Sequence, residues 1–419
     1  MEKNKPKIVV VGGGAGGMMA AGRAGQVGAL VTLIEKNKIL GKKILISGKG
    51  RCNVTNDCEI EELISNFPGN GKFLYGPLYS FSNNDLINFF TKLGVKLKKE
   101  RGGRVFPQSD SSKDIVDALI KYLNQARVNI ITGTDVKNII INNDQAQGVF
   151  LDNGTTISAD RIIIATGGVS FPGTGSTGDG YHWAKKTGHT IIPLRPSLIP
   201  LEVDEEWVKE LQGLSLKNVS VCIKNQKGKK IAEAFGEMIF THFGVSGPII
   251  LTLSRKAVDY WQKTSELLYL TIDLKPALSF EQLDNRLQRD IEKYSNKQLK
   301  NSLGDLLPNK MIQVIINKSQ IETNKVMNQI TKDERENLLK QLKGFELKLT
   351  RPRPISEAIV TAGGVSVKEI NPQTMESKLT KGLYFAGEVL DIDGITGGYN
   401  LQAAFSTGFV AGDAAARIN

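Results

Sequence analysis

A glycine-rich segment near the N-terminus has the residue types and spacing that hold a pyrophosphate. Residues Lys7–Gly17 form an apolar run that leads directly into the pattern G-x-G-x-x-G. Gly12 permits a tight turn, Gly14 lets the backbone approach the phosphates, and Gly17 lets a helix pack on the strand. The N–H groups at the start of that helix favour negative charge. The segment therefore predicts a strand–turn–helix unit with a dinucleotide site at Gly12, Gly14, Ala15, Gly16 and Gly17.

An acidic residue follows at the distance that this kind of site requires. Glu35 closes a second apolar run, Leu30–Ile34, and lies 18 residues after Gly17. A carboxylate at this place accepts hydrogen bonds from a ribose hydroxyl and disfavours a 2′-phosphate. The alternative, an ordinary glycine-rich turn with a surface glutamate, is disfavoured because strand, turn, helix and acid come in the required order.

Two later segments fit the same ligand. The first is Arg161–Gly168, an apolar run that ends in A-T-G-G, and the second is Gly382–Gln402, which contains F-A-G-E and G-G-Y-N-L-Q. Three such segments together predict non-covalently bound FAD and therefore a redox enzyme.

Length and composition predict the general class of protein. The chain has 419 residues, 40% of them hydrophobic and 23% charged, which is typical of a soluble protein of two or three domains. No apolar run is long enough for a membrane span. Three cysteines without a paired framework suggest a cytoplasmic protein. We expect no metal site, because no H-x-x-x-H, C-x-x-C or carboxylate cluster occurs.

The net charge of +11 is concentrated in two clusters of six basic residues each. They are Lys36, Lys38, Lys42, Lys43, Lys49 and Arg51, followed by Lys92, Lys96, Lys98, Lys99, Arg101 and Arg104. A cofactor pyrophosphate neutralises only about two positive charges, so the excess suggests an anionic substrate or a phosphodiester backbone. A lysine-rich solvated surface explains the charge equally well.

The periodicity changes twice along the chain. Residues 1–190 and 351–419 are predicted to form one discontinuous FAD-binding domain, because both contain dinucleotide-site segments. The region 191–279 has β-like patterns, and 280–350 has polar helical spacing. We expect an α/β, Rossmann-like FAD-binding domain with an inserted β-barrel-like plus helical domain.

Three residues outside the glycine segments are candidates for catalysis. Cys52 and His242 are possible proton donors, and Arg104 could bind a carbonyl or a phosphate. Small buried cysteines, loop-bracing histidines and surface arginines are the competing interpretations. A redox-active Cys52–Cys58 pair is disfavoured, because five residues separate the two and no second dinucleotide motif follows.

Several segments resemble one bacterial flavoprotein family, variously labelled BaiN-like, aminoacetone-oxidase-like and RdsA-like. They are Ser47–Asn56, Gly103–Pro107, Gly175–Gly180, Thr241–Pro248 and Gly387–Gln402. The resemblance covers essentially the whole chain and implies the Rossmann-like fold with an inserted domain. Members have been assigned reduction of steroid ring double bonds, oxidation of small amines, and reduction of uridine in ribosomal RNA.

The resemblance also implies which residues hold the cofactor. The Ser47–Asn56 loop would lie along the pyrophosphate and isoalloxazine, Glu388 would bind the ribityl chain, and a helix beginning near Asn400 would point its N-terminus at the flavin O2. With Glu35 and the first glycines, the expected cofactor residues are Lys36, Lys43, Ser47, Gly48, Gly50, Arg51, Asn53, Val136, Thr166, Gly167, Gly387, Glu388, Gly398, Asn400, Leu401 and Gln402.

These expectations lead to a ranked set of functions. The first is hydride transfer to a carbonyl-conjugated C=C bond, with uridine in 23S ribosomal RNA as substrate and NADH or NADPH as electron donor. The alternatives are a reductase of a small enone or steroid, an oxidase of a small amine, and a non-catalytic flavin-dependent RNA-binding factor.

Overall fold

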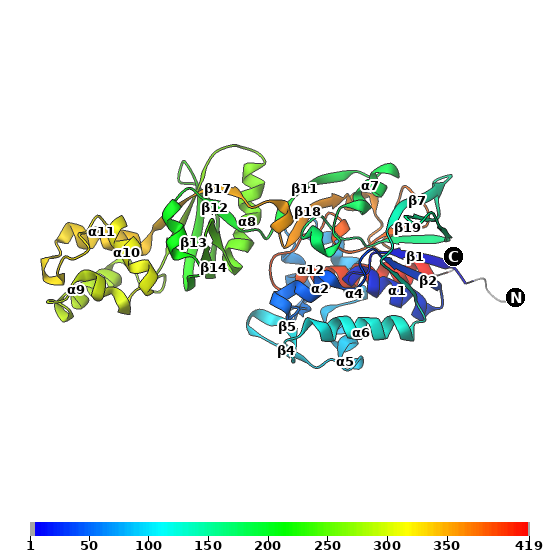
Figure 1. Ribbon diagram of the computed structural model, residues 1–419, viewed down its shortest axis with the longest axis horizontal. Coiled ribbons are helices and arrows are strands. Elements are labelled where there is room, and N and C mark those ends of the chain that lie inside the picture. The colour runs from blue at the N-terminus through cyan, green and yellow to red at the C-terminus, as the bar shows by residue number, and fades with distance from the viewer. Residues whose placement is uncertain (1–4, 418–419) are drawn as a thin grey trace. The chain divides into compact units, whose positions relative to one another are not determined.

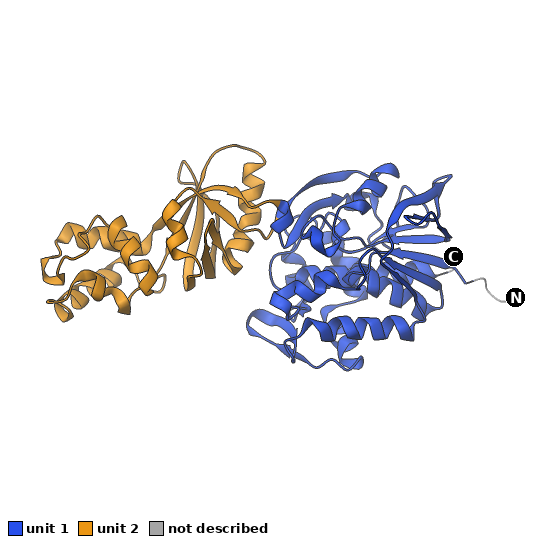
Figure 2. Cartoon of the chain, viewed as in Figure 1, with its two compact units in different colours: residues 1–196, 355–419 blue, residues 197–354 orange. Residues whose placement is uncertain are grey.

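The computed structural model describes residues 5–417 and divides the chain into two compact units. Unit 1 comprises Met1–Pro196 and Ile355–Asn419, and unit 2 comprises Ser197–Pro354 (Figure 2). The first boundary between the units lies after residue 196, six residues beyond the expected boundary after residue 190. The reason is that strand β11 (Ile191–Ser197) pairs with β18 (Val360–Val365), a strand of unit 1.

A parallel five-stranded sheet forms the centre of unit 1 (Figure 1). Its order is β19 (Leu383–Phe385), β10 (Arg161–Ile164), β1 (Lys7–Val11), β2 (Leu30–Glu35) and β6 (Asn129–Thr132). The middle strands are almost continuously apolar and buried, as expected for a parallel sheet covered on both faces.

Two helices of unit 1 pack closely against each other. They are α1 (Ala15–Val27) and α12 (Tyr399–Ala416). A Cβ built on Gly408 of α12 would lie 2.3 Å from the Gly16 carbonyl oxygen of α1. Small residues on both helices permit this close approach.

The other elements of unit 1 surround this centre. Two antiparallel sheets are β3 (Thr55–Asn56), β5 (Arg104–Pro107) and β4 (Leu97–Lys99), and β7 (Val136–Asn142), β8 (Gln145–Leu151) and β9 (Thr156–Ser158). The α-helices are α2 (Lys42–Ile46), α3 (Ile60–Ser65), α4 (Tyr75–Ser80), α5 (Asn83–Lys92), α6 (Ser112–Gln125) and α7 (Asp179–Lys186). Short 3-10 turns include η1 (Ser47–Gly50), η4 (Pro172–Thr174) and η11 (Gly387–Val389).

Unit 2 contains a closed six-stranded barrel and four helices. The barrel order is β12 (Leu201–Val203), β15 (Gly244–Ser246), β14 (Lys230–Thr241), β13 (Ser215–Asn225), β16 (Leu268–Asp273) and β17 (Phe345–Pro352). The helices are α8 (Pro248–Trp261), α9 (Phe280–Lys293), α10 (Asn309–Lys318) and α11 (Lys332–Lys343). The barrel and helix residues share one hydrophobic cluster.

The predicted fold class is confirmed: a Rossmann-type α/β domain carries an inserted barrel and helices. Within residues 5–417, no helix is long and apolar enough to cross a membrane.

Candidate functional site

A cavity in unit 1 is formed by the three segments that the sequence singled out. Its wall includes the turn after β1, the ends of β2 and β10, and the first turn of α12. Of the expected cofactor residues, these line it: Gly12, Gly14, Ala15, Gly16, Glu35, Lys36, Lys43, Ser47, Val136, Thr166, Gly167, Gly387, Glu388, Asn400 and Leu401. Segments far apart in the chain therefore meet at the carboxyl edge of the sheet, where open α/β sheets bind ligands.

The three motif glycines have different surroundings: Gly12 and Gly14 line the cavity, and Gly17 lies behind its wall. Gly12 has φ +106°, and a Cβ on it would lie 2.5 Å from the Ala165 carbonyl oxygen. A Cβ on Gly17 would lie 1.8 Å from the Gly12 oxygen, so Gly17 permits helix-on-strand packing. A Cβ on Gly14 would meet no atom within 4 Å. The space beside Gly14 is consequently open to a ligand.

Glu35 is held rigidly at the end of β2. It is buried, and its Oε2 accepts the Gly13 N–H at 2.7 Å. Its Oε1 accepts the backbone N–H of Asn37 at 2.8 Å and the side-chain amide of Asn37 at 2.6 Å. A fixed carboxylate beside the glycine turn is the arrangement expected for a ribose contact.

Lys43 and Glu388 form an ion pair in the cavity wall. Lys43 Nζ lies 2.7 Å from Glu388 Oε2 and also donates to Ser170 Oγ at 2.7 Å. Glu388 Oε1 accepts from Ser170 Oγ at 3.1 Å and from the Thr361 N–H at 2.8 Å. The carboxylate therefore has three donors, which hold it in one orientation.

A second ion pair lies near Glu35. Lys36 Nζ contacts Asp179 Oδ2 at 2.6 Å and also donates to Thr177. Gly178 caps α7, and Asp179 is the first residue of that helix. A carboxylate in the first turn complements the helix dipole.

The cavity also contains polar groups that suit a dinucleotide. Thr166 is a wall residue whose hydroxyl oxygen is buried beside Gly180 without a hydrogen-bond partner among the described residues. Helix α12 starts after Gly398, and Asn400 and Leu401 in its first turn line the cavity. Because the first N–H groups of a helix lack intrahelical partners, this end can bind an anionic or carbonyl oxygen. The residues present therefore fit FAD.

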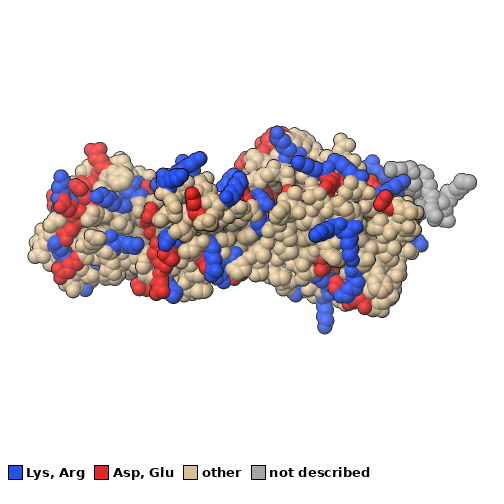
Figure 3. Space-filling model, turned by 90° about the horizontal axis from the view of Figure 1, so that it is seen from above, with Lys and Arg blue, Asp and Glu red and all other residues tan. Residues whose placement is uncertain are grey.

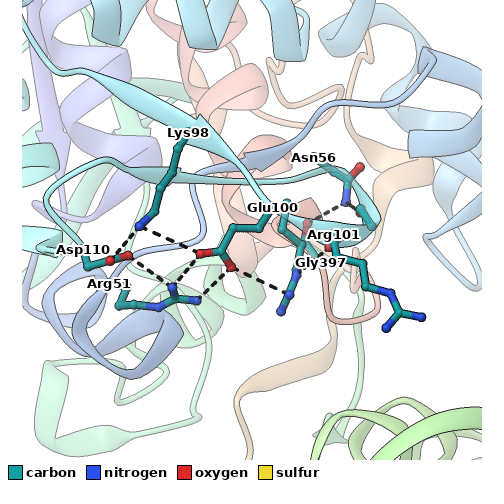
Figure 4. A network of polar contacts seen from close by, with 9 residues as sticks. Arg51, Asn56, Lys98, Glu100, Arg101, Asp110 and Gly397 are labelled. Carbon is teal, nitrogen blue, oxygen red and sulfur yellow. Dashed lines mark hydrogen bonds and ion pairs between the residues drawn. The ribbon is translucent and has the colours of Figure 1, made fainter. Parts of the chain in front are cut away.

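Arg51 belongs to a polar network instead of the cavity wall (Figure 4). Its guanidinium donates to both carboxylate oxygens of Glu100, at 2.8 and 3.2 Å, and to Asp110 at 3.1 Å. It also lies 4.1 Å from the ring centre of Phe106. The hydrogen bond from Arg51 lowers the pKa of Glu100. Lys98 completes the network through Asp110 at 2.6 Å.

The loop before β3 has a left-handed backbone at four places. Positive φ angles occur at Gly48, Lys49, Gly50 and Cys52.

Cys52 is fully buried, outside the cavity wall, and burial raises the pKa of its thiol to about 12. The amide oxygen of Asn53 is buried without a partner among the described residues. Cys58 is half-buried and, like Cys52, is not in a disulfide.

Several predicted residues lie elsewhere. Gln402 is buried, where it accepts from Thr55 Oγ1 at 2.6 Å and donates to Ser406 at 2.9 Å. Arg104 contacts Glu100 at 3.8 Å with a side chain 43% exposed. His242 lies in unit 2, in the turn between β14 and β15, with its ring edge-on to Phe243. Gly17, Gly48, Gly50, Arg51, Asn53 and Gly398 are likewise outside the cavity wall, and the ligand roles of all these residues stay predictions.

The structure adds wall residues that the sequence did not indicate. They include Asn37, Thr134, Asp135, Ser176, Trp183 and Ile359. Ser176 lies in the Gly175–Gly180 segment of the resemblance but is not among the expected cofactor residues. Neither a glycine pattern nor the resemblance points to the other five, because they enter the wall through tertiary packing. The one signal in the sequence is their position: Asn37 follows β2, and Thr134 and Asp135 follow β6, so both places lie at the carboxyl ends of parallel strands.

The two basic clusters are partly neutralised. Acidic partners within 4 Å are present for Lys36, Lys43, Arg51, Lys98, Lys99 and Arg104. Most of these acids are distant in sequence. The face in Figure 3 accordingly shows basic and acidic side chains interspersed. Among the described residues, no group of three or more His, Cys, Asp or Glu could hold a metal.

Known proteins resemble the chain over nearly its full length. It is 33% identical to the 3-dehydro-bile acid delta(4,6)-reductase of Clostridium scindens, with 98% of this chain and 99% of that protein aligned. It is also 33% identical to the ribosomal RNA dihydrouridine synthase of Escherichia coli, over 95% of both chains. The crystal structure of 3-ketosteroid delta1-dehydrogenase from Sterolibacterium denitrificans has a similar fold, with a TM-score of 0.54, 14% identity and coverage of 99% and 100%.

The prediction that the chain is an FAD-dependent oxidoreductase is confirmed by the family and by these relatives. Residues 6–414 match the HI0933-like protein Rossmann domain, and the chain belongs to that family.

Proposed function

We propose that this enzyme reduces a C=C bond conjugated to a carbonyl, with uridine in 23S ribosomal RNA as substrate and dihydrouridine as product. The observation that carries the proposal is the full-length likeness to two enzymes whose names describe this chemistry, a dihydrouridine synthase and a reductase of a bile-acid double bond. Both acceptors are electron-poor alkenes, so the same site chemistry serves either one.

The cavity residues would bind and orient the cofactor. Gly14 leaves room for the pyrophosphate, Glu35 is placed to accept from the adenosine ribose, and Glu388 from the ribityl hydroxyls. The N-terminus of α12 would stabilise negative charge near the flavin C2 carbonyl. FAD, when bound, supplies the hydride.

A protein acid would protonate the carbon next to the carbonyl. Cys52 and His242 remain the candidates. Cys52 keeps its proton at neutral pH, because burial raises its pKa to about 12. His242 is exposed and lies in unit 2. Arg104, exposed beside the Arg51 network, is the candidate for binding a carbonyl or phosphate oxygen.

The electron donor in this proposal is NADH or NADPH. It would bind transiently, because the sequence contains a single G-x-G-x-x-G unit followed by an acid at the required distance.

A second candidate function is reduction of a small enone such as a steroid. The equal identity to the bile acid reductase favours it. An amine oxidase, by contrast, would release peroxide in air when given a small amine.

Deletion of the gene tests the proposal. We expect the deletion strain to lose one or more dihydrouridines from 23S ribosomal RNA, and the wild-type gene to restore them. Complementation with Cys52→Ala and His242→Ala identifies the proton donor, because its removal should slow the reaction by about 10²–10⁴-fold. Full retention of dihydrouridine in the deletion strain contradicts the proposal.

A further inference from the structure

Four adjacent strands of the barrel place basic and aromatic side chains in one row. Lys224 of β13 is in register with Lys230 of β14 and with Tyr269 of β16, and Tyr269 is in register with Lys348 of β17. The strand neighbours of Tyr269 and Lys348 are fully buried; they are Leu268, Leu270, Leu347 and Leu349. Because side chains alternate along a strand, the row lies on the outer surface of the barrel.

The turn between β13 and β14 extends this row. Residues 224–230 contain four lysines and no acid. The Asn225 side-chain oxygen accepts the N–H groups of Lys227 at 3.1 Å and Lys229 at 2.9 Å. The Asn225 amide also donates to the Tyr260 hydroxyl of α8 at 3.3 Å. The backbone of the turn is thereby braced, and the side chains of Lys227 and Lys229 are exposed to solvent.

Ion pairs are formed by the two end lysines of the row. The hydrogen bond from Lys230 lowers the pKa of the Glu233 carboxyl, and Lys224 lies close enough for its charge to lower that pKa further. Lys230 pairs with Glu233 and Lys348 with Asp204, both at 2.8 Å and both partly exposed. Such exposed ion pairs contribute little to stability, so another anion can readily displace the carboxylate. Lys224, Lys227 and Lys229 make no ion pair within residues 5–417. Like charges opposite each other on neighbouring strands, as at Lys224 and Lys230, repel, and a bound anion would relieve that repulsion.

We propose that this surface, the lysine row of Lys224, Lys227, Lys229, Lys230, Tyr269 and Lys348, binds the phosphate backbone of the RNA substrate. The inference rests on the proposed function. Spaced cations beside a partly exposed aromatic ring suit an unpaired RNA segment, since phosphates bind the cations and a base stacks on the ring. The lysine row therefore supplies affinity for RNA through unit 2.

The test is a salt titration of binding to an unmodified 23S ribosomal RNA transcript. The variant carries Lys224→Gln, Lys227→Gln and Lys229→Gln. Its matched control carries Lys297→Gln, Lys300→Gln and Lys332→Gln, which remove the same charge from the helical part of unit 2. We expect the row variant to bind about tenfold more weakly, with a log–log salt slope shallower by about 2. The control should keep the wild-type slope, and both should retain FAD.

Substitutions of Tyr269 test the stacking of a base on its ring independently of the lysines. Tyr269→Leu should weaken binding without changing the salt slope, whereas Tyr269→Phe should bind as the wild type does. Equal slopes and affinities for the row variant and the wild type would overturn the inference. If the slopes differ as expected but the wild type forms no dihydrouridine in this RNA, the lysine row stands and the substrate assignment fails.

Discussion

Lys43 of α2 forms an ion pair with Glu388 of η11, and Lys43 Nζ lies 2.7 Å from Glu388 Oε2. The pair joins two segments that are 345 residues apart in the sequence. Both residues line the cavity, and Glu388 also accepts from Ser170 and Thr361. The pair thus fixes one wall of the predicted cofactor site by charge-assisted hydrogen bonds.

Glu388→Gln should therefore weaken FAD binding. The substitution leaves Lys43 without its counter-ion and replaces an acceptor by a partial donor, so we expect about a tenfold rise in the FAD dissociation constant. Fluorescence titration of the apoprotein measures it. Glu369→Gln is the control, because Glu369 accepts two hydrogen bonds from Thr190 outside the cavity wall. Equal losses in both variants would contradict the role of Glu388.

Two glycine substitutions should separate binding from folding. Gly14→Ala places a methyl group in open space at φ −83°, so the apoprotein should melt like the wild type but bind FAD more weakly. Gly17→Ala forces a methyl group against the Gly12 oxygen and should destabilise the fold by several kcal/mol, about 2–4. Thermal melting of the two apoproteins distinguishes them, and a Gly14→Ala protein that unfolds early would refute the open-space argument.

Arg51 should matter more than Arg104 for the loop at Ser47–Cys52. Arg51 binds Glu100 bidentately and stacks on Phe106, whereas Arg104 reaches the same carboxylate only at 3.8 Å. We expect Arg51→Ala to make the loop more sensitive to limited proteolysis and Arg104→Ala to leave it unchanged. Matching cleavage rates in the two variants would argue against a positioning role for Arg51.

Cys52 should make the protein less stable at alkaline pH. Its pKa rises from an ordinary value near 9 to about 12 in the fold. The unfolded thiol ionises first, so the stability that the buried thiol contributes is complete below pH 9 and declines towards pH 12. Between pH 8 and 10.5, wild type should lose about 2 kcal/mol more unfolding free energy than Cys52→Ser. Parallel pH profiles in urea titrations would contradict this.

The strand–turn–helix elements beside the cavity were predictable because they are local in sequence. The strands at Lys7–Val11 and Leu30–Glu35 and the glycines between them are encoded within 35 residues. The helix expected near Asn400 begins at Tyr399 for the same reason.

Longer-range features were not predictable from the sequence. Arg51 belongs to a basic cluster in the sequence, yet Glu100 and Asp110, which neutralise it, follow 49 and 59 residues later. Gln402 lies in a segment that resembles the flavoprotein family, but its buried side chain forms hydrogen bonds with Thr55 and Ser406. Closure of the barrel depends on β17 pairing with β12 and β16, which no local pattern specifies.

The most direct test of the central claim is reduction of ribosomal RNA by the purified holoenzyme. Unmodified 23S ribosomal RNA transcript is incubated with the FAD-loaded protein and NADH or NADPH, and its nucleosides are analysed by mass spectrometry. We predict a uridine heavier by two hydrogens at a defined position, absent when the electron donor is left out. Unchanged uridine, together with rapid reduction of a steroid enone by the same preparation, would contradict the RNA assignment.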